Sequence, residues 1–297
     1  MTTLQDAKRV VRAHNTALKA AGPADIGAAL AENTTDNWHW RGMHPFHEQY
    51  GAAAVSEVFY KPFLQAFSRV QLREDVFFAG LNNCDNQSSI WVGSMGHLMG
   101  LFDAPFLGIK PTSRIAMLRY ATFHRVEGGK IVETSLFVDL LHLMMQTGQY
   151  PLPPQTGAHL VQPGPLTHAG LLYHDADVAE GTKTLALINR MISDINGHEK
   201  YKTRQEEQCW HDDMIWWGPA GIGATYTIDR YIDQHQMPFR SHLKDRIYNG
   251  HICRIAEGDF GGFFGWANLT VTNAGGYMGL PAGQPADMRV VDIYRRE

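Results

Sequence analysis

The sequence predicts an α+β fold that is built twice in tandem, and three observations lead to this prediction. Residues 5–21 place apolar side chains at the spacing of a helix. Residues 116–126 and 131–139 alternate in the manner of strands and are joined by Gly128-Gly129, a hairpin signal. Aromatic, glycine and proline residues of the first half recur in the second half at a nearly constant distance. We therefore expect helices followed by an antiparallel sheet in each half.

Four segments have the apolar spacing of helices. The first ends at Gly22-Pro23, which stops a helix. The third is bent or broken at Pro62, because proline removes a backbone donor from a helix interior. A glycine-flanked strand that carries His97 precedes the two strands of the hairpin. In order, the predicted helices are residues 5–21, 25–32, 51–67 and about 182–195.

The two halves match at positions that chance rarely aligns. Trp40 and Trp216 are 176 positions apart, and the distance falls to 170 toward the C-terminus through small loop deletions. A repeat of this length indicates a duplicated domain rather than a solenoid. Further pairs at 176 are Gly42 and Gly218, Tyr50 and Tyr226, and Pro62-Phe63 and Pro238-Phe239; pairs at 170 are Arg119 and Arg289, Arg125 and Arg295, and Glu127 and Glu297.

The repeat divides the chain into a first domain at 1–149, a linker at 150–176 and a second domain at 177–297. The linker is too rich in proline for regular structure. The second copy ends where the first begins its glycine turn, so we expect it to lack the final strand, the carboxylate and the terminal helix. Either the sequence is short of the natural C-terminus, or the second copy is completed from elsewhere.

Bulk composition narrows the class of protein. With 44% hydrophobic and 19% charged residues, the 297-residue chain can bury a sizeable core. A net charge of −4 argues against nucleic acid or an anionic membrane as partner, since both select basic surfaces. The sequence shows no signal peptide and no apolar run of about 18 residues. The three cysteines are far apart, which predicts reduced thiols and a cytoplasmic protein.

Several motifs resemble those of the SnoaL-like polyketide cyclases, a family within the nuclear-transport-factor-2-like (NTF2-like) group. The resemblance spans about 36–149, and 212–297 more weakly. In the family's Pro-Thr-Gly turn, Ser113 stands at the glycine position. The motifs are Gly96-His97-x-x-Gly100, Gly108-Ile109-x-Pro111-Thr112, the run Arg125 to Glu133 leading to Asp139, and Gln146-x-Gly148.

The resemblance implies a cystatin-like architecture for each domain: a cone of curved antiparallel sheet wrapped by N-terminal helices, with a deep apolar pocket. Such folds dimerise sheet on sheet, so we expect an internal pseudo-dimer of the two domains and allow for a homo-oligomer. The implied activity is acid/base catalysis on a hydrophobic carbonyl compound in the first domain, by aldol closure, isomerisation or dehydration, without a cofactor. Two alternatives remain, a non-catalytic binding protein for a small hydrophobic molecule and an assembly role through an exposed sheet face.

The resemblance also points to site residues in the first copy. Asp139 matches the family's acid/base carboxylate, and desolvation in an apolar cone makes a carboxylate a better base. The alternative for Asp139 is to cap the helix that follows it. His97 and His124 are the candidate donors to an enolate oxygen, although His97 also fits a hydrogen-bonded interior histidine. The expected substrate-binding residues are Trp40, Tyr120, Thr122, Met95 and Phe137.

Two questions about the site stay open in the sequence. Tyr120, Thr122 and His124 share one face of their strand, but alternation alone does not tell which face lines the pocket. In the second copy Asp292 and Tyr294 replace Thr122 and His124. We expect that copy to be structural, or to bind ligand without turning it over.

Two other residue groups suggest a metal site and a kinase-like motif, and we reject both interpretations. His39, His44 and His47 lie close together, but their spacing matches no standard zinc pattern, so no metal is expected. The run Gly258 to Gly265 contains Asp-Phe-Gly, but the chain lacks the other kinase motifs and a phosphate loop. It is predicted to be a strand with glycine bulges.

Overall fold

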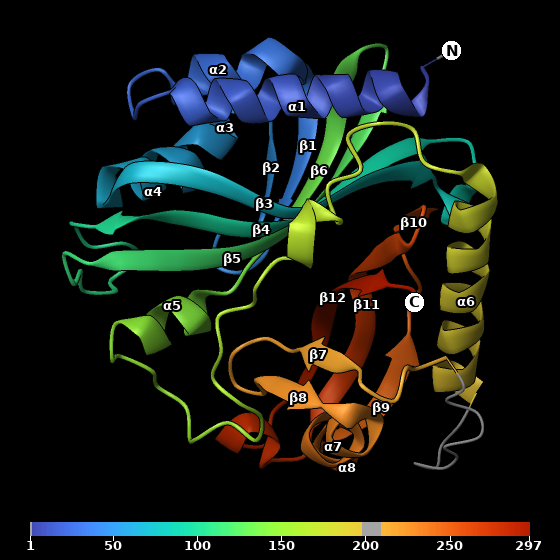
Figure 1. The fold of residues 1–297 in the computed structure, drawn as a ribbon. Coiled ribbons are helices and arrows are strands. Elements are labelled where there is room, and N and C mark those ends of the chain that lie inside the picture. The colour runs from blue at the N-terminus through green and yellow to red at the C-terminus, as the bar shows by residue number, and fades with distance from the viewer. Residues whose placement is uncertain (1, 198–208) are drawn as a thin grey trace.

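The computed structural model describes residues 2–197 and 209–297 and confirms the α+β fold with curved sheets and helices (Figure 1). In the first copy, α1 and α2 lie over one face of a six-stranded sheet. Its helical elements are α1 (Leu4–Ala20), α2 (Ile26–Asn33), α3 (Ala52–Val55), η1 (Ser56–Tyr60), α4 (Lys61–Ala66), η2 (Asn83–Asp85) and α5 (Leu140–Gln146). Its strands are β1 (Thr34–Gly42), β2 (Glu48–Tyr50), β3 (Phe67–Leu81), β4 (Ile90–Phe102), β5 (Ile115–Glu127) and β6 (Lys130–Val138).

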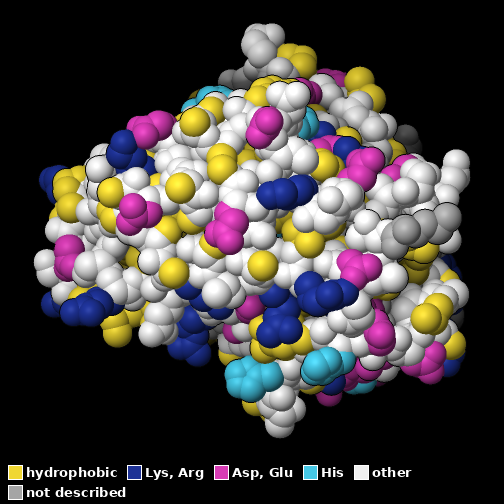
Figure 2. All heavy atoms as spheres, turned by 90° about the horizontal axis from the view of Figure 1, so that it is seen from above, with side chains coloured by type: hydrophobic (Ala, Val, Ile, Leu, Met, Phe, Trp, Pro, Cys, Tyr) yellow, Lys and Arg dark blue, Asp and Glu magenta, His cyan; other side chains and the backbone are white. Residues whose placement is uncertain are grey.

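Local chemistry explains where α1 begins and which side it buries. The Thr3 hydroxyl and the Asp6 carboxylate form a reciprocal capping box at its start. Its buried face includes Ala7 and Val11, at the spacing of a helix stripe. Figure 2 shows the outer face above α1 and α2, where apolar atoms are interspersed with charged side chains of both signs.

The third predicted helix is continuous rather than broken. A π-helical turn, η1, joins α3 to α4, and Pro62 lies in the first turn of α4. The chain stays helical up to the proline because the Lys61 N–H donates to the Ser56 carbonyl, five residues back, in the wider π-turn that precedes Pro62. The sheet has the order β2-β1-β6-β5-β4-β3, with β1 and β6 as its parallel pair. Gly128 and Gly129, with φ of 57° and 76°, form the predicted turn between β5 and β6.

The second copy repeats the order of most of these elements, with shorter strands and without a described counterpart of β6 or α5. Its helical elements are α6 (Val178–Gly197), α7 (Thr227–Tyr231), η4 (Ile232–Gln236), α8 (Met237–His242) and η5 (Tyr277–Gly279), and the linker holds η3 (Leu166–His168). Its strands are β7 (Ile215–Trp217), β8 (Ala224–Tyr226), β9 (Leu243–Tyr248), β10 (Cys253–Glu257), β11 (Phe260–Asn273) and β12 (Pro285–Arg295). Even the π-turn recurs, since η1 and η4 are 176 positions apart at both ends.

The same side-chain contacts recur with the elements. In the first copy Trp40 pairs with Gln49, and in the second Trp216 pairs with Thr225 at the equivalent register. A Cβ on Gly42 would lie 2.1 Å from the Trp40 ring, and one on Gly218 would lie 2.2 Å from the Trp216 ring. Both positions therefore require glycine because an indole packs on the backbone.

One difference between the sheets of the two copies concerns β6. In the first copy β6 lies between β1 and β5. In the second, β7 and β8 form a separate two-stranded sheet, and β12 pairs with β11 alone among the residues that the structure describes. A slot is therefore left between β7 and β12 where the first copy has β6.

The two sheets pack on each other through a shared hydrophobic cluster. Phe123 and Phe137 of the first copy contact Phe264 of the second, with ring centroids 5.4 Å and 6.3 Å apart. Aromatic pairs at such distances stabilise a core beyond the area they bury. The other buried members are Val76, Phe78, Trp91, Cys253, Ile255 and Phe260.

A buried ion pair also joins the copies. The Lys8 ammonium of α1 is bonded to the Glu257 carboxylate of β10, and these side chains are 1% and 6% exposed. Lys8 also donates to the His174 carbonyl at 3.0 Å, and Glu257 accepts from the Ala79 backbone N–H at 2.8 Å. Burial raises the pKa of the Glu257 carboxyl, while the bond from Lys8 opposes that rise.

Within the described residues, no helix is long and apolar enough to cross a membrane.

We predict that Lys8→Met lowers the free energy of unfolding by about 3–5 kcal/mol, because it leaves a buried carboxylate without its cation. Chemical denaturation at pH 7 measures this loss. Lys19→Met, on an exposed position of the same helix, is the matched control and should change stability by less than about 0.5 kcal/mol. Lys8→Met combined with Glu257→Leu should recover most of the loss; equal stability of Lys8→Met and Lys19→Met would contradict the prediction.

Candidate functional site

The slot between β7 and β12 opens into a cavity of about 2370 Å³. Its walls come from both copies: β12, α6 and the β7–β8 hairpin of the second, and the outer face of the β5–β6 pair of the first. Such a volume exceeds the roughly 300–1,000 Å³ of ordinary ligand pockets. It follows from the fold, because the place that β6 fills in the first copy holds no strand among the described residues of the second.

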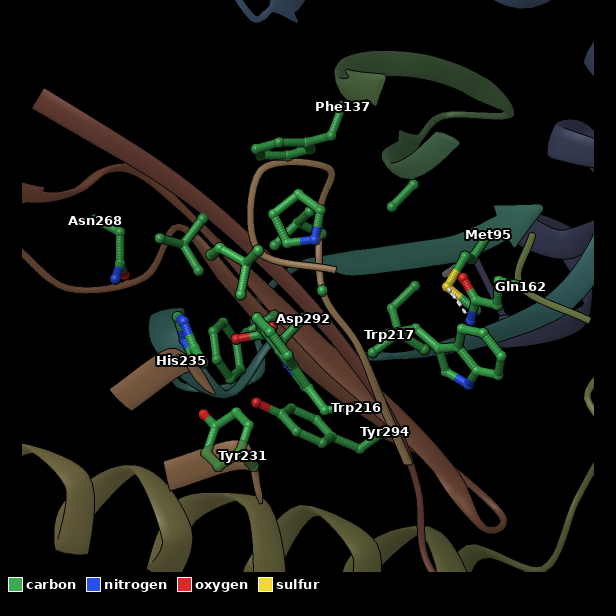
Figure 3. A pocket seen from close by; sticks show the side chains of 18 of the residues that line it. Met95, Phe137, Gln162, Trp216, Trp217, Tyr231, His235, Asn268, Asp292 and Tyr294 are labelled. Atoms are coloured by element: carbon green, nitrogen blue, oxygen red, sulfur yellow. Dashed lines mark hydrogen bonds between the residues drawn. The ribbon is translucent and has the colours of Figure 1, made fainter. Parts of the chain in front are cut away.

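Aromatic side chains form one wall of the cavity (Figure 3). His235 stacks on Trp216 with ring centroids 4.2 Å apart and an interplanar angle of 17°. Tyr231 lies edge-on to Trp216 at 5.2 Å, and Trp210 lies 5.4 Å from Tyr231. A wall of this kind suits a flat apolar ligand, because rings stack on its faces and the tyrosine hydroxyls supply polar ends.

Asp292 is the carboxylic acid of this wall. It follows Val291 on β12, so it points to the α6 side, away from the cluster between the sheets. Desolvation raises the pKa of Asp292 from its ordinary value of 3.8 to about 7, although a hydrogen bond with Tyr294 opposes the rise. None of the described lysine, arginine or histidine side chains forms an ion pair with it. Asp292 therefore exchanges a proton near neutral pH inside an aromatic cavity.

The neighbours of Asp292 are uncharged. Burial raises the pKa of the Tyr294 hydroxyl well above its usual value. Burial lowers the pKa of His235 to about 4, and its Nδ1 is buried without a partner. The site thus combines one titrating acid with tyrosine hydroxyls and a neutral imidazole.

Comparison of the copies shows what changed at this position. The interior residues Val55, Phe59 and Thr122 of the first copy correspond to Tyr231, His235 and Asp292 of the second. The first set belongs to a filled interior, in which Val55 and Phe59 are fully buried. Three positions of one fold have therefore become titratable in the copy that contains the cavity. Replacement of apolar by titratable residues across the repeat is the sequence signal that could have located this site.

The residues predicted from the sequence do not form one site, because they lie on two sides of the first sheet. Met95, Phe137 and Asp139 contribute to the cavity wall; Tyr120 borders it, but its side chain packs in the interior cluster with its hydroxyl 3.1 Å from that of Ser94. Trp40, Thr122 and His124 lie in the interior that α1 and α2 cover, and His97 is not part of the wall. A single ligand in one pocket cannot contact both groups.

Asp139 caps α5 and holds the second copy. Its Oδ1 accepts from the backbone N–H of His142 at 2.9 Å, which is the capping alternative considered for it. Its Oδ2 accepts from the Arg119 guanidinium at 3.1 Å and from the Ala220 backbone N–H at 2.9 Å. Arg119 also donates to the carbonyls of Trp217 and Gly218, at 3.0 Å and 2.9 Å. We call this set the Arg119–Asp139 clasp; it fixes the loop after β7, and this geometry does not favour a free base.

The two candidate histidines are both buried. His124 is 4% exposed, and its Nδ1 lies 2.9 Å from the hydroxyl of Thr134, which accepts from Trp38. The His124 ring and the Thr134 hydroxyl therefore share a hydrogen bond inside the fold, and burial lowers the pKa of His124 well below its usual value. His97 Nδ1 lies 3.2 Å from the Asp75 carboxylate, and its Nε2 is buried without a partner.

Metal-binding residue types are present, but the described ones do not form a donor set. No group of three or more His, Cys, Asp or Glu in the described ranges is arranged to hold an ion. The rings of His44 and His47 are 5.5 Å apart, while His39 is bonded to Glu48 at 2.6 Å and stacks on Tyr50.

No protein-family model and no curated protein matches the chain. Similar solved structures include a protein assigned as a SnoaL-like polyketide cyclase from Jannaschia sp. CCS1, with 19% identity, 50% of this chain and 95% of that chain covered, and a TM-score of 0.39. AclR from Streptomyces galilaeus, assigned as a hydroxylase, has 16% identity, 51% and 87% coverage and a TM-score of 0.41. An NTF2-like protein from Burkholderia thailandensis E264 has 19% identity, 48% and 96% coverage and a TM-score of 0.35. These neighbours are of the kinds that the sequence motifs resemble.

We predict that Asp139→Ala lowers the free energy of unfolding by about 2–4 kcal/mol, because it removes a helix cap, takes the carboxylate from Arg119 and leaves the Ala220 N–H without its acceptor. Urea denaturation measures this change. Asp25→Ala is the matched control, since Asp25 stands at the start of α2 without a side-chain cap bond. Similar, small losses in both variants would show that the Arg119–Asp139 clasp contributes little.

We predict that Asp292→Asn stabilises the protein, and more so as pH rises. A raised folded-state pKa means that the folded protein binds more protons than the unfolded chain between about pH 4 and 7, so stability falls as pH rises through that window. At about 1.4 kcal/mol per pKa unit, the gain above pH 7 is as much as about 4 kcal/mol. The measurement is Tm from pH 4 to 8. Asp287→Asn, on an exposed position of the same strand, should give no pH-dependent difference; the same result for Asp292→Asn would refute the raised pKa.

Proposed function

We propose that the protein is an acid/base enzyme for an apolar, ring-containing carbonyl compound, which binds in the cavity of the second copy. The observation that carries this proposal is Asp292, a carboxyl group that forms no ion pair with the described side chains and is set in an aromatic wall beside Tyr294 and Tyr231. This moves the expected site from the first copy to the second. The first copy then serves as scaffold and supplies part of the wall.

The chemistry follows from the roles that these groups can take. Asp292 as carboxylate accepts a proton from the carbon beside a carbonyl group, and the electron pair of that C–H bond moves to give an enolate. A pKa near 7 keeps enough carboxylate at neutral pH and leaves it basic enough to act. Neutral hydroxyl donors stabilise the developing oxygen charge without forming a salt with the base. Return of the proton to another atom would complete an isomerisation.

Two further points support the proposal and are themselves proposals. The cluster between the sheets, centred on Phe123, Phe137 and Phe264, is the contact expected if the two copies form an internal pseudo-dimer. A cytoplasmic location suits an enzyme with three free cysteines. A binding protein without turnover is the second candidate, favoured by the large size of the cavity.

Proton exchange tests the proposal without knowledge of the natural substrate. We expect the protein to accelerate hydrogen–deuterium exchange at the carbon beside the carbonyl of 1-tetralone in D₂O, followed by proton NMR. The rate should rise with pH and level off above about pH 7, as Asp292 ionises. Asp292→Asn should lower the enzymatic rate by at least about 100-fold, the usual contribution of a general base.

Controls separate the two candidate carboxylates and the two candidate functions. Asp287→Asn should keep the wild-type rate, because its carboxylate is outside the cavity wall. A loss of exchange in Asp139→Asn but not in Asp292→Asn would identify Asp139 of the first copy as the catalytic base. Binding of 1-tetralone with no exchange in the wild type would favour a binding protein.

A further inference from the structure

A second polar group faces the cavity from the loop between β9 and β10. His251 lies in the cavity wall and stacks on Phe263, with ring centroids 3.9 Å apart and an interplanar angle of 10°. Phe263 of β11 pairs directly with Asp292 of β12. Side chains at such paired positions are about 5 Å apart on the same face of a sheet. His251 and Asp292 therefore border the same aromatic ring.

Arg254 determines which nitrogen of His251 carries the proton. Its Nη2 and Nε lie 2.9 Å and 3.3 Å from Nδ1 of His251. A guanidinium only donates hydrogen bonds, so Nδ1 must be the acceptor and the proton of the neutral ring must be on Nε2. Arg254 is itself held, because its Nη1 donates to Asn189 of α6 at 2.7 Å and its backbone N–H donates to Asn82 of the first copy at 3.0 Å.

The Nε2–H group of His251 is left for a ligand. No acceptor among the described side chains and backbone carbonyls takes it, and the ring is partly exposed in the cavity wall. Burial and the adjacent Arg254 charge lower the pKa of His251 to about 3, so the ring keeps this single donor throughout the neutral range. A neutral, oriented donor suits a carbonyl or enolate oxygen and offers nothing to a hydroxyl that must donate.

We infer that His251 binds the carbonyl oxygen of the ligand through Nε2–H, with Arg254 as the positioning residue that holds its tautomer. This rests on the proposed function and deepens it: the substrate presents its carbonyl oxygen to His251 and the adjacent C–H bond to Asp292. The site thereby selects ring-containing ketones over hydrocarbons of the same shape.

The test compares 1-tetralone with tetralin, which has the same rings without the carbonyl oxygen. The fluorescence of Trp210, Trp216 and Trp217, all in the cavity wall, reports the two Kd values. His251→Phe keeps an aromatic ring on Phe263 but removes the donor. We expect it to weaken 1-tetralone binding about five-fold relative to tetralin, the usual net effect of one hydrogen bond. His159→Phe, an exposed histidine outside the cavity wall, is the matched control and should keep the wild-type ratio.

A spectroscopic measurement tests Arg254 without any ligand. In ¹⁵N-labelled protein, the signals lost in His251→Phe identify His251, and we expect them to show a neutral ring protonated at Nε2 from pH 5 to 8. Arg254→Met should allow exchange between tautomers, which a merely structural role of Arg254 would not produce. A proton on Nδ1 in the wild type overturns the inference.

The outcomes separate this inference from the proposed function. If both compounds bind and His251→Phe leaves their ratio unchanged, the inference fails while Asp292 catalysis stands or falls on the exchange measurement. If wild-type protein binds neither compound and exchanges no proton, the proposed function fails and the inference fails with it.

Discussion

The contact between the two sheets is the constraint on which the rest of the structure depends. Phe123 and Phe137 of the first copy pack on Phe264 of the second, and this places the outer face of the first sheet against the slot beside β12. The cavity is therefore neither the interior of one cone nor a surface groove. It lies between the first copy, whose sheet contains β6, and the second copy, which has no described strand at that place. The sheet of the first copy supplies one wall of the cavity.

Asp292 illustrates how that space changes the properties of a side chain. The equivalent residue of the first copy, Thr122, donates to the Ser135 carbonyl of β6 at 2.8 Å. On the edge of β12 that faces away from β11, none of the described strands of the second copy is paired, and Asp292 faces the cavity, where burial disfavours its charge. Burial of this carboxyl group costs stability when it is charged, which is a common trade at functional sites.

Much of the fold could be predicted from the sequence because its signals are local or periodic. Helix spacing located α1, the two glycines located the β5–β6 turn, and the repeat of Trp40 as Trp216 revealed the duplication. The site was harder to predict. Which face of β5 is covered depends on where α1 packs, and alternation along a strand does not show this. The oxygens of Asp139 are bound to a loop about 80 residues away, so its role as clasp required the tertiary structure.

The bond between Lys8 and Glu257 has a consequence for synthesis of the chain. A ribosome completes α1 long before β10, so the Lys8 ammonium has no carboxylate to meet until most of the chain has been made. The first copy therefore emerges with a charged side chain at a position that the finished protein buries. The N-terminal helix α1 should therefore dock stably on the sheet last, although it is made first. Until then the nascent first copy would expose part of its core to chaperones.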